Sequence, residues 1–173
     1  MERAGQLLPP ASRRKGGVLL ASKRVHSALT VPERSTVREF FDAYRAAFEA
    51  FDVAAIADLF SYPCQVTGDA GELAVTTIAT RVAWISQIER LVAAYRAIGA
   101  RAAEVLELEV TELAPRLAQA TVHWGLVDVE GGRIYDFDAS YILADLGEGM
   151  RITAIAHNET PRLRALIERQ RLT

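Results

Sequence analysis

The sequence predicts an α+β fold in which helices precede a mainly antiparallel sheet. Between residues 36 and 98, apolar residues recur at three- and four-residue spacing, which is typical of amphipathic helices. From Arg101 to His157 the period changes to two, which is typical of strands with one buried face. A length of 173 residues suits one domain with a core of its own.

The first predicted helix begins at Ser35-Thr36, because Thr36 followed by Glu39 forms a capping-box pattern. Its apolar stripe consists of Val37, Phe40, Phe41, Tyr44, Phe48 and Phe51. Asp52 can cap a second, short helix. That helix must end before Pro63, since the residue preceding a proline disfavours the α region.

A small hairpin is expected at residues 64–77, with its turn at Gly68 to Gly71. Thr80 then caps a third helix, and Gly99 ends it. The apolar stripe of this helix consists of Trp84, Ile88, Leu91, Tyr95 and Ile98.

Four strands follow, and the middle two form a hairpin that turns at Gly131-Gly132. Their alternation places an apolar set on one face, consisting of Leu106, Leu108, Val122, Trp124, Phe137, Leu143, Ile152, Ala154 and Ala156. The opposite face is largely polar. A last helix is predicted from about Thr160 to Arg171, with Pro161 in its first turn.

Charge divides the chain into two parts. Residues 1–34 hold seven basic and two acidic side chains without a helical or strand period, which predicts a disordered basic tail before a domain at 35–173. A transit peptide, a nucleic-acid arm and a tail without function all fit that composition. The domain holds thirteen basic and twenty acidic side chains and would repel a phosphate backbone, so we expect no nucleic acid partner for it.

The remaining bulk features are those of a soluble protein. No apolar run approaches the roughly 18 residues of a membrane helix, so we expect no membrane partner and a cytoplasmic location. The single cysteine, Cys64, excludes an intrachain disulfide and is interpreted as a small buried hydrophobe.

The order of elements resembles the nuclear transport factor 2-like superfamily, also called the SnoaL-like or cystatin-like roll, over about residues 35–158. The resemblance lies in the following segments: Phe40 to Phe60, Tyr62 to Gly68, Trp84 to Ala100, His123 to Leu143, and Met150 to Glu159. It implies a cone-shaped roll in which a strongly curved sheet wraps the helices around a pocket. It also implies a homodimer formed through the sheet. The superfamily includes isomerases, dehydratases, epoxide hydrolases, cyclases and non-catalytic binders, so the fold does not select a function.

One hypothesis is a cofactor-independent isomerase, dehydratase or cyclase. Asp138 or His123 would be the general base, and Tyr44 or Tyr62 would stabilise the developing oxyanion. This chemistry requires the base to face the pocket. Strand alternation instead places His123, Asp136, Asp138 and His157 on the outer face, unless a β-bulge reverses the alternation.

The leading hypothesis is a protein that binds a small apolar or aromatic molecule. The pocket would be lined by Tyr44, Phe48, Trp84, Tyr95, Trp124, Tyr135 and Tyr141, although aromatic stripes often only fill a core. A third hypothesis is an interaction module that docks a partner on the polar sheet face. Glu159, which follows the last strand, is interpreted as a solvated strand-end residue.

Neither a metal nor a nucleotide cofactor is expected. A metal could be held only by His123, His157 and Asp136 or Asp138, and no ligand motif such as HxH or HExxH is present. No Gly-rich segment connects a strand to a helix.

Overall fold

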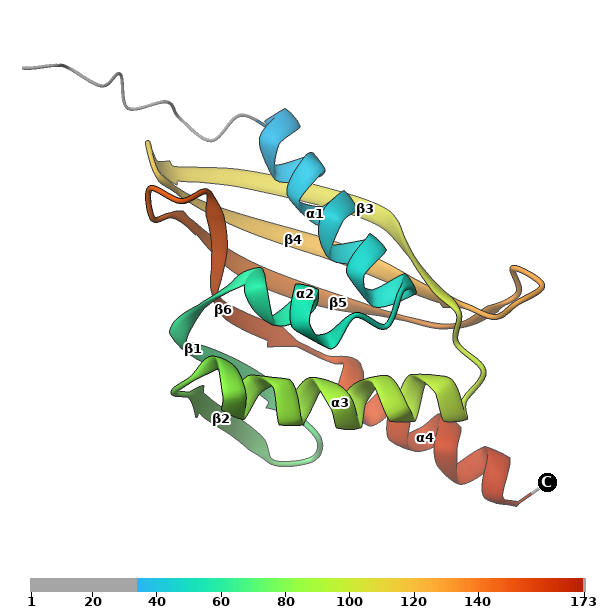
Figure 1. Ribbon diagram of the computed structural model, residues 1–173. Helices are drawn as coiled ribbons and strands as arrows, with labels where there is room; N and C mark the ends of the chain where they lie inside the picture. Colours follow the sequence, from blue (N-terminus) through green and yellow to red (C-terminus); the bar gives the residue numbers. More distant parts are fainter. Residues whose placement is uncertain (1–33, 173) are drawn as a thin grey trace, which may run out of the picture.

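Four helices and one six-stranded sheet make up residues 34–172, the part of the chain that the computed structural model describes (Figure 1). The elements are, in chain order, α1 (Arg34–Glu49), α2 (Val53–Asp58), β1 (Phe60–Asp69), β2 (Leu73–Ile78), α3 (Arg81–Ala97), β3 (Ala102–Ala114), β4 (Leu117–Val127), β5 (Arg133–Asp145), β6 (Met150–His157) and α4 (Glu159–Arg171). The predicted α+β class is confirmed. The predicted basic tail lies outside the described residues, apart from Arg34.

The sheet has the strand order β2-β1-β6-β5-β4-β3. All neighbouring strands are antiparallel except β1 and β6, which pair in parallel. Helices α1, α2 and α3 lie over one face of the sheet, while α4 lies beyond the end of β6 (Figure 1). That arrangement gives the sheet a helix-covered inner face and an uncovered outer face. No described helix is long and apolar enough to cross a membrane.

Local capping groups form where the sequence predicts them. The Asp52 carboxylate accepts a hydrogen bond from the Ala55 N–H at 2.9 Å, and the Thr80 hydroxyl accepts one from the Ala83 N–H at 3.2 Å. Gly99 follows α3 with φ +80°, a conformation that favours glycine. One boundary differs, because α1 begins at Arg34 and Thr36 therefore lies inside the first turn and not at the cap.

The core lies between α1 and the centre of the sheet. Val37 and Phe41 are buried on α1, and Val122 and Leu143 are buried on β4 and β5. The Phe41 ring packs edge-on against Tyr141 at a centroid distance of 4.9 Å. Cys64 belongs to this core, as predicted.

Two β-bulges change the predicted alternation. In β3, Val105 pairs with Trp124 and Glu107 with His123, so Leu106 is the extra residue and Val105 packs on the core in its place. The prediction that Leu106 faces inward is therefore wrong.

The bulge in β6 lies closer to the end of the chain. Ile152 pairs with Leu143, but Ala154 pairs with Ile142, which leaves Thr153 as the extra residue. Beyond it Ile155 is buried, whereas Ala156 is exposed. Ala154 and Ala156 are therefore not inward, and the prediction that His157 faces outward is also wrong.

Candidate functional site

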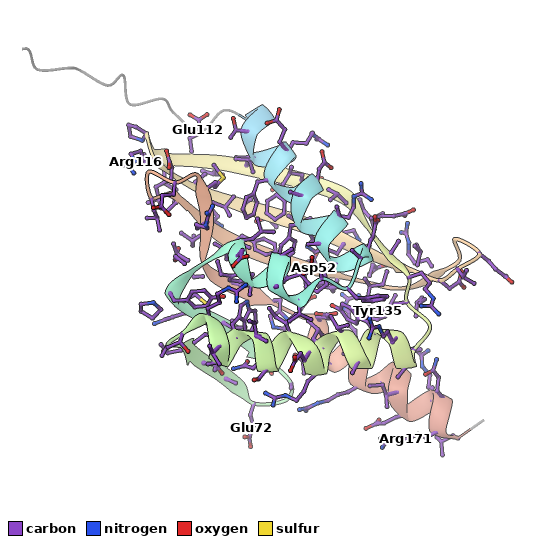
Figure 2. The ribbon with its side chains drawn as sticks, in the orientation of Figure 1. Asp52, Glu72, Glu112, Arg116, Tyr135 and Arg171 are labelled. Carbon is purple, nitrogen blue, oxygen red and sulfur yellow. The ribbon has the colours of Figure 1, made fainter. Side chains whose placement is uncertain are left out.

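A cavity of about 370 Å³ lies between the inner sheet face and helices α1, α3 and α4. Its wall is mainly apolar, and Figure 2 shows side chains crowding the space between these helices and the sheet. The apolar wall residues are Tyr44, Phe48, Val66, Trp84, Ile88, Leu91, Tyr95, Ala103, Trp124, Leu126, Phe137, Ala139, Tyr141, Ile155, Leu163 and Ile167. Six of these are among the seven aromatic residues predicted from the sequence.

Tyr135 is the seventh predicted residue, and it does not line the cavity. It lies on the side of β5 that faces α3 and α4 (Figure 2). Its hydroxyl donates a hydrogen bond to Glu159 Oε1 at 2.7 Å. Tyr135 therefore contacts Glu159, which lines the cavity, although Tyr135 itself does not line it.

Glu159 is the one buried charged residue among the described residues, with 6% of its surface exposed. It is the first residue of α4 and lines the cavity. Its Oε1 accepts hydrogen bonds from the hydroxyls of Tyr95 and Tyr135. Burial raises the pKa of Glu159, and the two tyrosine hydroxyls oppose that rise because they stabilise the ionised form.

The interpretation of Glu159 as a solvated strand-end residue is therefore wrong. The β6 bulge turns the end of the strand toward the cavity, and α4 begins there. No local pattern in the sequence indicates this, since a glutamate in the first turn of a helix is common at exposed positions.

A second polar group in the wall consists of Tyr44, Tyr141 and Trp124. The Trp124 indole N–H donates to the Tyr141 hydroxyl at 2.9 Å, and the Tyr44 hydroxyl interacts electrostatically with that of Tyr141. Burial raises the pKa of both tyrosines. Both hydroxyls therefore stay protonated at neutral pH and can donate to a ligand oxygen or accept from a ligand donor.

His157 and Trp84 each have a buried nitrogen without a hydrogen-bond partner among the described residues, namely His157 Nδ1 and Trp84 Nε1. Burial lowers the pKa of His157, so its ring is neutral at neutral pH. A Cβ at Gly68 would lie 3.3 Å from His157 Nε2, so β1 packs closely on this ring.

His123 and Asp138 lie on the outer face, between inward residues of β4 and β5. His123 Nδ1 lies 2.7 Å from Asp138 Oδ1, and their side chains are 33% and 52% exposed. Asn158 Nδ2 donates to Asp138 Oδ2 at 3.0 Å. The hydrogen bond with His123, followed by that with Asn158, lowers the pKa of Asp138.

A general base must face the pocket, and Asp138 and His123 lie on the opposite face of the sheet. Asp136 also lies outside the cavity, where it pairs with Arg162 at 3.0 Å. Of the two candidate oxygen donors, Tyr44 lines the cavity, while the Tyr62 hydroxyl donates to the Ala57 carbonyl at 2.8 Å. Within residues 34–172 no three His, Cys, Asp or Glu side chains group into a metal site.

Comparison with known proteins identifies the relatives of the chain. A family model described as NTF2-like protein (DUF6841) matches residues 33–160. A search of curated proteins gave no match.

Several solved structures are similar. An NTF2-like protein with a cystatin-like fold from Novosphingobium aromaticivorans is 21% identical, with 77% of this chain and 87% of that chain covered and a TM-score of 0.58. A domain of unknown function with a cystatin-like fold from Nostoc punctiforme is 18% identical, with 83% and 89% covered and a TM-score of 0.56. Aln2 from a Streptomyces species is 16% identical, with 79% and 99% covered and a TM-score of 0.59. At these identities the likeness shows the fold alone.

Proposed function

The chain belongs to this NTF2-like family, and we propose that it binds a small, largely apolar or aromatic molecule in the cavity between the sheet and the helices. The observation that supports this function is the composition of the cavity wall. Aromatic and aliphatic side chains form most of it, and a few buried polar groups interrupt it, among them Glu159 and the Tyr44–Tyr141 hydroxyl pair. Ligand sites typically have this composition, and volumes of roughly 300–1,000 Å³ are usual for them.

Binding is favoured over the catalytic hypothesis that was based on Asp138 and His123. Their side chains hydrogen-bond to each other on the outer face, away from the cavity where a substrate would lie. A base must come within hydrogen-bond reach of the proton it removes. The outer face offers these groups to solvent or to a partner surface instead.

The homodimer through the sheet stays a prediction, as does the role of the outer face in docking another protein. The outer face is uncovered by helices and carries the His123–Asp138 pair and the exposed Ala156. A mass measurement in solution checks self-association, and a strict monomer would contradict the dimer.

Intrinsic fluorescence offers a direct test of binding, because both tryptophans of the chain, Trp84 and Trp124, line the cavity. Titration with phenethyl alcohol should change tryptophan emission in a saturable way. Ala139→Leu fills part of the cavity and should weaken this binding by about tenfold or more, since overfilling a packed wall leaves no room for the probe.

Ala156→Leu is the matched control, because it makes the same change on the outer face and should leave the affinity unchanged. Both variants are first compared with the parent by melting temperature. Equal affinity in a folded Ala139→Leu protein would contradict the proposed site.

A further inference from the structure

We propose that the molecule held in this cavity is an amine, and that Glu159 is the anion that binds its ammonium group. This inference rests on the proposed function and specifies the ligand class. It depends on three features of the cavity: a buried carboxyl group without a cation, arginines that bond to groups other than Glu159, and an aromatic wall.

The Glu159 carboxyl group lacks a cationic partner. Among the described residues its side chain forms no ion pair, and its two hydrogen bonds come from neutral tyrosine hydroxyls at Oε1. Oε2 therefore stays available to a ligand. An isolated carboxylate in an apolar site is costly, and a ligand that supplies the missing positive charge offsets part of that cost.

The tyrosine hydroxyls hold the carboxyl group in a fixed orientation. Tyr95 reaches Glu159 from α3 and Tyr135 reaches it from β5. Burial raises the pKa of both tyrosines, so they stay protonated and act as donors. Burial raises the pKa of Glu159, and the two donors at one carboxylate oxygen oppose that rise; an ammonium group beside the carboxyl group would favour the ionised form further.

The other charged groups in the wall do not neutralise Glu159. Arg45 Nη1 lies 2.5 Å from Glu49 Oε1, and Arg164 Nη1 donates to the Ala70 carbonyl at 3.4 Å. His157 is neutral because burial lowers its pKa. The remaining titratable groups that face the cavity are the hydroxyls of Tyr44, Tyr95 and Tyr141, which are neutral as well.

The aromatic wall suits the same ligand class. Tyr44, Phe48, Trp84, Tyr95, Trp124 and Tyr141 present their rings to the cavity space. An ammonium group is attracted to the face of an aromatic ring, most strongly where water is excluded. A neutral ligand gains only the apolar contact from these rings, and a carboxylate ligand is repelled by Glu159.

The test uses three probes of nearly equal shape: phenethylamine, phenethyl alcohol and phenylacetate. Tryptophan emission of the full chain is titrated with each at neutral pH. We expect the amine to bind about tenfold or more tightly than the alcohol, and phenylacetate to bind most weakly, because a charged hydrogen bond is stronger than a neutral one.

Glu159→Gln should abolish the amine preference while leaving the affinity for the alcohol within about twofold. Asp138→Asn is the matched control, since it neutralises a carboxylate on the outer face, and it should keep the preference. Glu159→Asp keeps the charge and should retain part of the amine preference.

Equal binding of the amine and the alcohol would overturn the amine assignment while leaving the proposed function in place. An amine preference that survives in Glu159→Gln would overturn the role of Glu159. Absence of saturable binding for all three probes would instead count against the proposed function.

If Glu159→Gln does not fold, the unmodified chain gives the same information. Its amine preference should disappear as acidification protonates Glu159, while the alcohol affinity stays constant. A preference that persists through that titration would also overturn the proposal.

Discussion

Two carboxyl groups on opposite faces of the sheet, Asp138 and Glu159, have opposite environments. Asp138 on the outer face lies beside His123 and Asn158, and its pKa is lowered. Glu159 on the inner face is buried beside two neutral hydroxyls, and its pKa is raised. The chain connects them closely, because Asn158 hydrogen-bonds to Asp138 and the next residue is Glu159.

The difference shows that residue types alone do not indicate which carboxyl group is buried. His123, Asp136 and Asp138 have the residue types of a catalytic group, yet each has a hydrogen-bonded or charged partner at the surface. Glu159 is a single residue, yet it is the one that desolvation and the cavity make chemically unusual. The following substitutions test this contrast.

The largest loss of stability is expected for Trp124→Ala, and a small one for the neighbouring residue of β4, His123. Trp124→Ala removes a ring that is 3% exposed and breaks its hydrogen bond to Tyr141, so it should cost about 3–5 kcal/mol in the free energy of unfolding. His123→Ala removes a half-exposed member of a surface pair and should cost about 1 kcal/mol or less. Urea denaturation of both variants checks this. Similar losses would contradict the assignment of inner and outer faces.

Glu159 should make the protein less stable as pH rises. Its folded-state pKa is raised above the ordinary 4.5, so the folded state holds the proton over a range where the unfolded state has released it. The free energy of unfolding therefore falls between pH 4.5 and the folded-state pKa. In Glu159→Gln this fall should be absent, as measured by urea denaturation across that range. A slope unchanged in the variant would contradict the buried placement.

The contribution of Asp138 to the free energy of unfolding should have the opposite dependence on pH. Its folded-state pKa is lowered from the ordinary 3.8, so its contribution is present above 3.8 and is lost as pH falls through the folded-state value. Asp138→Asn should cost about 1 kcal/mol or less at neutral pH and should flatten the acid side of the stability curve. A steeper acid loss in the variant would contradict this account.

The smallest effect is expected for the cross-strand pair of Thr121 and Ser140, whose hydroxyl oxygens lie 3.2 Å apart on the outer face. Thr121→Val keeps the shape of the side chain and removes the hydrogen bond, so it should cost about 0.2–1 kcal/mol. Thermal denaturation measures the shift. A loss as large as that of Trp124→Ala would show that the outer face is buried in a partner.

Much of the fold follows from short-range patterns. Asp52 and Thr80 cap helices through contacts three residues away, and the strict alternation of β4 and β5 fixes their inward faces. The bulges are harder to predict, because Leu106 and Thr153 become extra residues only through pairing with another strand.

The candidate site could be predicted only in part, because some of its residues follow short-range patterns and others depend on contacts that are distant in the sequence. Aromatic residues at helical spacing predict wall positions such as Tyr44 and Trp84. Glu159 is buried by contacts with Tyr95 and Tyr135, which lie 64 and 24 residues earlier in the chain. Nothing within a few residues of Glu159 specifies those partners.

The extra residue in β6, Thr153, shifts the alternation of the side chains that follow it. If Thr153 instead paired with Ile142 as a regular strand residue, every later side chain of the strand would exchange one face for the other. His157 would then lie outside the cavity wall, and so would Glu159, the first residue of α4. The chemical character of this cavity therefore depends on how β6 pairs with β5 as well as on the identity of its residues.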